Sequence, residues 1–206
     1  MNRKPHIFGQ FRVLVSLSVL AAFVTLASAQ PARTQGLSVQ IDPAQSKVAY
    51  SLSSTVHTVH GTFAVKNGSL HYDPSSGQMS GTIVVDATSG QSGNDSRDGR
   101  MHREILESAK FPEIVFLPAK LTGAVAADGI SKVEVSGRFR LHGQEHDVTL
   151  PAEVTVNGKN LDITTHMDIP YVKWGLKNPS NFLLHVSEIV SIEIQARGIV
   201  QTAGNP

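Results

Sequence analysis

Residues 133–141 read VEVSGRFRL, with an apolar residue or glycine at every second position and Glu, Ser or Arg between them. Successive side chains of a β-strand point to opposite faces, so this period of two predicts a strand with one dry and one solvated face. The same alternation recurs at residues 48–52, 63–65, 83–85, 114–118, 148–156, 161–169 and 190–196. Strands of this kind are typical of antiparallel sheets, so the sequence predicts an all-β fold.

Turn-forming pairs separate these runs. They are Asn67-Gly68, Asp73-Pro74, Asp128-Gly129, His142-Gly143 and Asn157-Gly158. Such residues favour the tight turns that join antiparallel neighbours. About eight short strands predict either a β-sandwich or a closed barrel, and the periodicity leaves both architectures open.

One segment departs from the strand pattern. Residues 98–108 read DGRMHREILES, in which Met101, Ile105 and Leu106 are spaced as on one face of a helix. Asp98 is suited to cap the N-terminus of that helix. We therefore expect one short helix between two strands, acting as a cover for the sheet.

The first 29 residues predict a cleaved signal peptide. Arg3, Lys4 and Arg12 precede an apolar stretch at residues 13–27, and Ala27-Ser28-Ala29 supplies a small-x-small cleavage pattern. The apolar stretch is shorter than the roughly 20 residues of a membrane span, although an uncleaved anchor is the alternative. Cleavage between Ala29 and Gln30 predicts a periplasmic or secreted protein without a stable membrane span.

The mature chain is then expected to have three parts: a flexible leader at residues 30–36, a barrel domain at residues 37–201 and a disordered tail at residues 202–206. Cleavage would remove three positive charges and no negative one, taking the formal net charge from +1 to −2. This balance argues against a nucleic-acid partner. The 206 residues include no Cys, which excludes disulfides, thiol catalysis and Cys-ligated zinc.

Several short motifs follow one another in order. They read IDPAQSKV at residues 41–48, GTF at 61–63, RD at 97–98, SAKFP at 108–112, IVF at 114–116, GRFRLHG at 137–143, VTLP at 148–151 and WGL at 174–176. In this order they resemble the YceI-like family of secreted lipid-binding proteins, over roughly residues 37–200. The chain departs from the family's Arg-x-x-Phe/Trp-Gly element, because residues 170–173 before Trp174-Gly175 read PYVK.

The resemblance implies an eight-stranded antiparallel lipocalin-like barrel with one short helix between strands. Its apolar interior would hold an isoprenoid or another long-chain amphiphilic lipid, for transport or storage, without catalysis and without a cofactor. The expected wall residues are Phe63, Val85, Phe111, Phe116, Phe139, Leu150, Ile163, Trp174, Leu176 and Ile192. Core filling is the alternative role for each of them, since the core of such a barrel is also the wall of its cavity.

Candidates for a head-group site at the barrel mouth are Arg97, Asp98 and His102. The alternative is that Arg97 and Asp98 pair with each other or cap the helix. The protein is also a possible homodimer, which the sequence does not decide.

Two other functions compete with lipid carriage. One is a stress-related binding or scaffold module whose barrel interior is packed. The other is a metal-dependent hydrolase around His142 and His146, which flank a turn and could converge, although a solvated hairpin explains them as well. The sequence has no His-Glu-x-x-His, Gly-x-Ser-x-Gly or phosphate-binding glycine motif, so we expect no enzyme.

Overall fold

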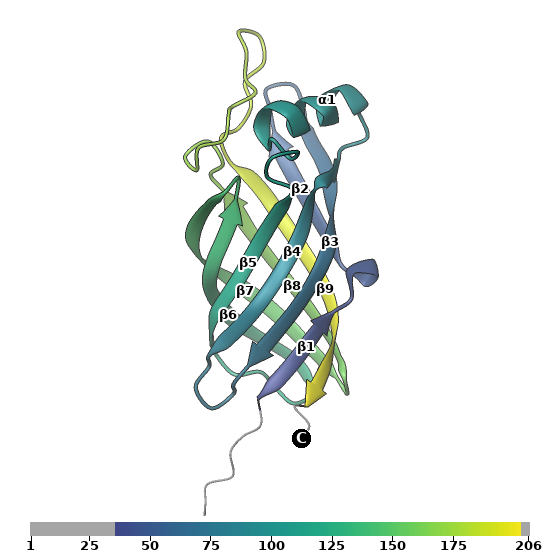
Figure 1. Ribbon diagram of the computed structural model, residues 1–206, viewed down its shortest axis with the longest axis vertical. Coiled ribbons are helices and arrows are strands. Elements are labelled where there is room, and N and C mark those ends of the chain that lie inside the picture. Colours follow the sequence, from purple (N-terminus) through teal and green to yellow (C-terminus); the bar gives the residue numbers. More distant parts are fainter. Residues whose placement is uncertain (1–35, 203–206) are drawn as a thin grey trace, which may run out of the picture. The chain divides into compact units, whose positions relative to one another are not determined.

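The computed structural model describes residues 36–202, most of which form β-strands that close into a barrel (Figure 1). The elements in chain order are β1 (Leu37–Ile41), the 3₁₀ turn η1 (Pro43–Gln45), β2 (Lys47–Ser53), β3 (Thr58–Tyr72), β4 (Met79–Gln91), the helix α1 (Asp95–Arg100), the π-helical turn η2 (Met101–Ile105), β5 (Glu113–Thr122), β6 (Gly129–Leu141), β7 (Gln144–Asn157), β8 (Asn160–Ile169) and β9 (Val190–Thr202). The expected signal peptide, residues 30–35 of the leader and residues 203–206 of the tail lie outside the described residues. Thr202 belongs to β9, one residue beyond the expected end of the domain.

The strands form an up-and-down barrel in which chain neighbours pair antiparallel from β2 to β9, and β9 pairs back with β2. The nine strand segments occupy eight positions, because β1 and β2 both lie between β3 and β9. The expected eight-stranded antiparallel barrel with one short helix is therefore confirmed, and the sandwich is excluded.

The break between β1 and β2 is built by Asp42 and Ser46. The Asp42 carboxylate accepts a hydrogen bond from the backbone N–H of Ala44 (2.9 Å), and Ser46 Oγ donates to the Asp42 carbonyl (2.7 Å). These bonds stabilise the η1 turn, which separates two segments that would otherwise form one strand. They also give a structural role to Asp42 and Ser46 of the IDPAQSKV motif at residues 41–48.

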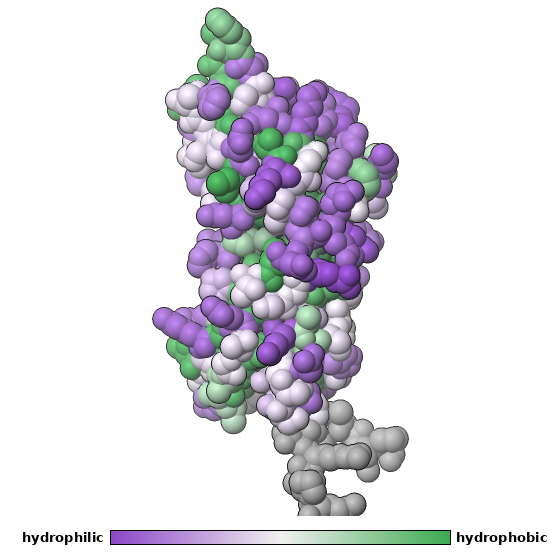
Figure 2. All heavy atoms as spheres, turned by 90° about the vertical axis from the view of Figure 1, so that its left-hand side faces the viewer, coloured by the Kyte–Doolittle hydropathy of each residue, from purple (hydrophilic) through white to green (hydrophobic). Residues whose placement is uncertain are grey.

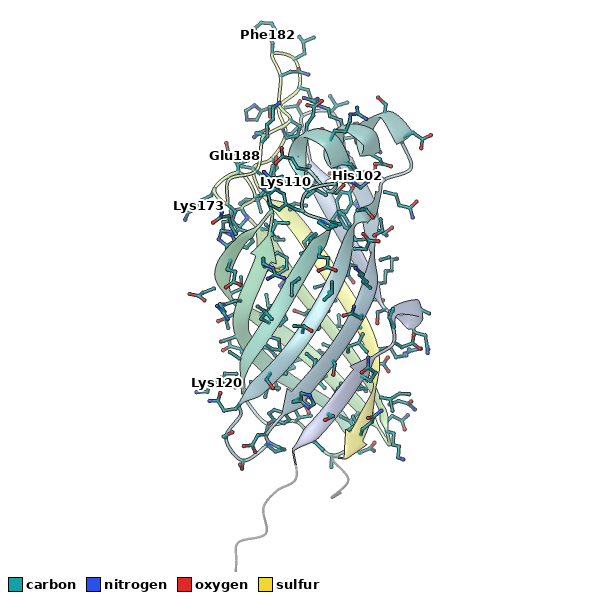
Figure 3. The ribbon with its side chains drawn as sticks, in the orientation of Figure 1. His102, Lys110, Lys120, Lys173, Phe182 and Glu188 are labelled. Atoms are coloured by element: carbon teal, nitrogen blue, oxygen red, sulfur yellow. The ribbon has the colours of Figure 1, made fainter. Side chains whose placement is uncertain are left out.

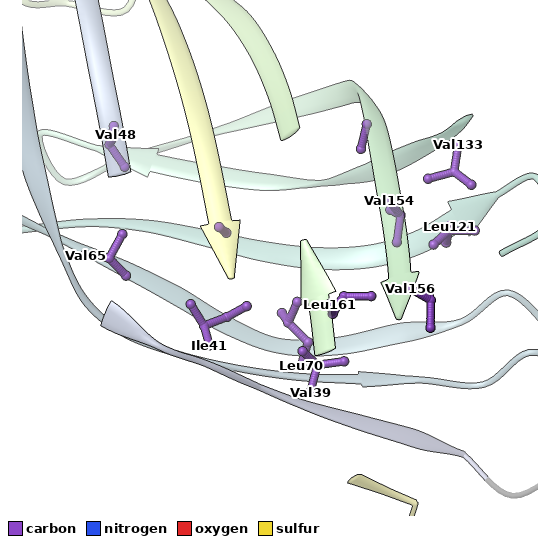
Figure 4. Packing of buried hydrophobic residues seen from close by; sticks show 12 residues of the cluster. Val39, Ile41, Val48, Val65, Leu70, Leu121, Val133, Val154, Val156 and Leu161 are labelled. Carbon is purple, nitrogen blue, oxygen red and sulfur yellow. The ribbon is translucent and has the colours of Figure 1, made fainter. Parts of the chain in front are cut away.

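Alternation within the strands fills the barrel with aliphatic side chains. In β6, Val133, Phe139 and Leu141 are buried, whereas Glu134 and Arg140 are exposed. One cluster gathers toward the end of the barrel where β1 begins and β9 ends, with side chains from several strands converging on the interior (Figure 4). A second cluster lies nearer α1 and includes Phe139, Met167 and Leu176. In the described part of the chain, no helix is long and apolar enough to cross a membrane.

Two local predictions are wrong. Asn67-Gly68 is not a turn, because both residues pair with β4 inside β3, next to a register shift between Val65 and Asn67. Glycine is needed there because a Cβ at Gly68 would come within 2.8 Å of the Ile41 side chain.

The helix also begins earlier than predicted. Its N-cap is Asn94, whose side chain accepts a hydrogen bond from the Arg97 N–H (3.0 Å), while Asp98 lies inside the first turn. The π-helical turn then continues to Ile105, so the cover ends before Ser108.

Candidate functional site

Two apolar cavities lie in series inside the barrel. One has a volume of about 530 Å³ and lies at the end that carries α1, and the other has a volume of about 460 Å³ and lies toward the opposite end. Ile114 of β5 lines both cavities, so the two spaces abut at this residue. The inward faces of the strands supply most of the wall of the second cavity, because the alternation of residues places aliphatic side chains there. The wall of the cavity at the helix end combines strand residues with residues of α1, η2 and the loops.

The cavity at the helix end is covered by two segments that are not strands. Met101, Ile105 and Leu106 reach it from the α1–η2 cover, and Leu184 and Val186 reach it from the loop between β8 and β9. The Tyr50 ring packs against Phe63 on this wall, with ring centroids 5.5 Å apart. Burial raises the pKa of the Tyr50 phenol, so this wall carries no charge from Tyr50 at neutral pH.

Sequence comparison assigns the barrel to a family. The sequence model of the YceI-like domain matches residues 39–197. The chain belongs to the YceI-like domain family. A UPF0312 protein of Vibrio parahaemolyticus is 26% identical to it over 148 residues, which cover 69% of this chain and 76% of the relative.

Two solved structures resemble this YceI-like domain in fold. Burkholderia cenocepacia BcnA superposes with a TM-score of 0.64 at 18% identity, covering 76% of this chain and 98% of BcnA. A polyisoprenoid binding domain from Saccharophagus degradans, implicated in plant cell wall breakdown, superposes with a TM-score of 0.61 at 16% identity, covering 79% of this chain and 98% of that domain. At these identities the likeness shows a shared barrel.

The structure places eight of the ten expected wall residues on the cavities of the YceI-like domain. The cavity at the helix end is lined by Phe63, Leu176 and Ile192. The other cavity is lined by Val85, Phe116, Phe139, Leu150 and Ile163.

Phe111 and Trp174 line neither cavity, and both belong to loops at the barrel rim. The Phe111 ring packs against the His142 ring, with centroids 4.3 Å apart, and approaches Gly143. The Trp174 indole stacks on His146 at 4.0 Å, with the planes 4° apart. Both aromatic rings therefore pack rim segments against the β6–β7 hairpin.

The head-group candidates mainly hold the cover in place through hydrogen bonds, and Figure 3 labels His102 among them. Arg97 lines the cavity at the helix end, yet its guanidinium donates to Ser92 Oγ (2.7 Å) and to the Ser92 carbonyl (3.0 Å). Asp98 accepts hydrogen bonds from the Ser92 hydroxyl and from the Ser92 N–H (2.9 Å). His102 Nε2 donates to the Gly90 carbonyl (2.8 Å). Neither Asp98 nor His102 lines either cavity.

The electrostatics of this corner follow from the same contacts. Burial raises the pKa of Asp98, but the hydrogen bonds from Ser92 and the charge of Arg97 outweigh it and hold the pKa below its usual range. Arg100 also lines this cavity and pairs with Glu104 (3.2 Å). No sequence pattern singles out Arg100, because a basic residue on a short helix is usually solvated.

His142 and His146 do not converge on a shared site. His142 Nε2 lies 2.7 Å from a carboxylate oxygen of Glu107, and this contact joins the end of the cover to the β6–β7 hairpin. His146 instead faces Trp174, and its Nε2 is buried without a hydrogen-bond partner among residues 36–202. Within that same range, no group of three or more His, Asp or Glu side chains is arranged to hold a metal ion.

Proposed function

We propose that this YceI-like protein binds a long-chain amphiphile, an isoprenoid or a fatty lipid, inside its barrel and transports or stores it without catalysing a reaction. The observation that carries the proposal is the pair of abutting apolar cavities of about 530 and 460 Å³. Each volume lies within the range of roughly 300–1,000 Å³ that is usual for ligand pockets. A scaffold with a packed interior would leave little of this space empty.

The wall chemistry supports an aliphatic ligand. Its side chains offer dispersion contacts and desolvation to a chain of methylenes, each worth about 0.8 kcal/mol on burial. Ten buried carbons contribute about 8 kcal/mol before the costs of ordering, so micromolar affinity requires a longer chain than this. The polyisoprenoid binding domain with the same fold supports an isoprenoid as the first class to test.

The predicted signal peptide supports a carrier that works outside the cytoplasm, either in the periplasm or after secretion. There a chain without Cys depends on its packed barrel for stability.

Organic extraction of the natively purified protein, followed by mass spectrometry, tests the proposal. We expect it to release a long-chain lipid. Ile114→Trp, placed where the two cavities abut, should lower the affinity for a fluorescent fatty-acid probe at least tenfold. Lys120→Trp is the matched control, because it adds the same ring to the exposed face of β5.

Both variants should keep the β-rich circular dichroism spectrum of the wild-type protein. If no lipid co-purifies and neither fatty acids nor polyprenyl lipids bind the stripped protein, the carrier proposal fails. If the Ile114→Trp variant and the wild-type protein bind the probe with equal affinity, the probe binds outside the cavities.

A further inference from the structure

An apolar tip projects from the helix end of the barrel. It belongs to the loop between β8 and β9, and Figure 2 shows it as a hydrophobic projection above a more polar surface. Phe182 is fully exposed and Leu183 is 85% exposed, while Val56 of the neighbouring β2–β3 loop is 73% exposed. Exposed apolar side chains grouped at one point generally mark a surface that contacts another apolar phase.

The tip is a defined turn that is tied to the barrel. The Asn181 side chain accepts hydrogen bonds from the N–H groups of Leu183 and Leu184, both at 2.9 Å. The His185 carbonyl accepts a hydrogen bond from the Thr55 N–H (2.9 Å), which joins the two loops. The fold therefore holds Phe182 and Leu183 outward while the barrel anchors the base of the loop.

Charge is absent from the tip and present behind it. Residues 178–187 and 51–59 include no Asp, Glu, Lys or Arg, and their only titratable groups are histidines. Lys110, Lys173 and Glu188 lie behind Phe182, toward the barrel (Figure 3). Among the described residues neither lysine forms an ion pair, and Lys110 Nζ lies 4.9 Å from the centre of the Phe111 ring.

The same loop also reaches the interior. Leu184 and Val186 line the cavity at the helix end, one to four residues from the exposed Phe182 and Leu183. The loop therefore presents apolar side chains to the outside and to the cavity at neighbouring positions. A long apolar chain that passes along it would stay in contact with apolar side chains.

We propose that this tip docks the barrel on a phospholipid bilayer, with Phe182 and Leu183 inserted among the acyl chains and the lysines at the level of the lipid phosphates. Docking in this way would let the cavity exchange ligand with the bilayer, and that role in exchange rests on the proposed function. Apolar side chains at the end and cationic side chains set back from it match the layers of a bilayer surface.

A bilayer fits this tip better than a protein partner. Stable protein interfaces bury roughly 800 Å² on each partner, whereas the tip offers a few side chains on a projecting loop. Insertion into acyl chains needs no complementary surface. The proposed cargo also resides in bilayers, so the docked state would place the cavity next to its source.

Co-sedimentation of the full mature chain with phosphatidylcholine–phosphatidylglycerol vesicles tests the docking. The wild-type protein should pellet with the vesicles, and the double variant Phe182→Ser, Leu183→Ser should lose at least tenfold in partition coefficient. Ile130→Ser is the matched control, because Ile130 is 66% exposed at the start of β6, at the opposite end of the barrel, and should leave pelleting unchanged.

Phe182→Trp gives a second readout. The chain has a single natural Trp, Trp174, so the added indole can be followed by subtracting the wild-type emission. Vesicles should shift the emission of the added indole to shorter wavelength. Failure of the wild-type protein to pellet, pelleting that does not depend on Phe182 and Leu183, or an unshifted emission would each overturn the docking proposal.

Two further measurements separate the possible failures. Affinity for a fluorescent fatty-acid probe without vesicles should be equal in the wild-type protein and the double variant. If neither protein binds the probe or a polyprenyl lipid, the carrier function fails, while vesicle pelleting still tests docking. If sedimentation equilibrium instead shows self-association that depends on Phe182, without vesicle binding, the tip joins copies of the chain and bilayer docking is wrong.

Discussion

Gly61 of β3 occupies a point where the barrel wall leaves no room for a side chain. A Cβ there would collide with the carbonyl oxygen of Gln91 on β4 and with the Tyr50 ring on β2. We expect Gly61→Ala to lower the free energy of unfolding by about 2–3 kcal/mol in urea titrations, because overpacking forces strands apart. Gly36→Ala, where the nearest atom lies at 3.6 Å, should change it by less than about 0.5 kcal/mol. Similar effects of the two substitutions would contradict this account.

The ionisation of Tyr171 should make the free energy of unfolding depend on pH in the alkaline range. Burial, with a smaller effect of Glu188, raises the pKa of its phenol to about 12, and the hydroxyl donates to the Ser187 carbonyl (2.8 Å). The unfolded chain ionises near its usual pKa of 10, so the stabilising contribution is complete below pH 10 and is lost as the pH rises toward 12.

Tyr171→Phe should therefore cost about 1 kcal/mol at pH 8, through the lost hydrogen bond, and should flatten the decline above pH 10. Chemical unfolding at pH 8, 10 and 11 measures both effects. An equally steep decline in the variant would show that Tyr171 does not cause it.

At the scale of elements, the α1–η2 cover depends on Ser92. This residue bonds both Arg97 and Asp98 and thereby fixes the start of the cover to the end of β4. Hydrogen bonds to charged groups contribute roughly 1.5–3 kcal/mol, so Ser92→Ala should speed amide exchange of residues 95–105 at least tenfold. Amides of β6 and β7 should not change. Ser136→Ala, which removes a hydroxyl contact on the outside of the barrel, is the control and should leave the cover unaffected.

The elements themselves were largely predictable from the sequence. A period of two identifies strands because a barrel has one dry and one wet face, and eight runs of this kind appear as strands. The turn predicted at Asn67-Gly68 is wrong because the same two residue types suit both a turn and a β-bulge, and here they follow a register shift within β3 and lie beside Ile41. The break at η1 depends on local hydrogen bonds of Asp42 that hydrophobic periodicity does not register.

At the scale of the whole molecule, binding and stability are linked. A ligand that binds only the folded barrel stabilises it by about 2.7 kcal/mol at a concentration one hundred times Kd. For a domain of this size, the melting temperature of stripped protein should rise by about 5–10 °C on loading. Differential scanning calorimetry checks this, with Ile114→Trp as the variant in which the rise should shrink. An unchanged melting temperature at saturating lipid would contradict interior binding.

The site was less predictable than the fold. Seven of the expected wall residues line the cavities because strand alternation fixes which face they share, whereas Leu176 reaches its cavity from the loop between β8 and β9. Phe111 and Trp174 line neither cavity, and the sequence carries no periodic signal for where aromatic residues in loops pack. Leu184 and Val186 also line the cavity at the helix end, but they belong to an irregular loop. Its path leaves no periodic pattern in the sequence from which their position could be predicted.

The meeting of the two cavities at Ile114 has a consequence for stoichiometry. A ligand short enough to fill one chamber leaves the other vacant, so two such molecules can occupy one barrel. A longer chain must pass Ile114 and then excludes a second molecule. Across a homologous series of fatty acids, we expect the number of molecules bound per barrel to fall from two to one at the chain length that first extends past Ile114. Isothermal titration calorimetry measures this number, so the chain length at which it drops would locate Ile114 along the barrel.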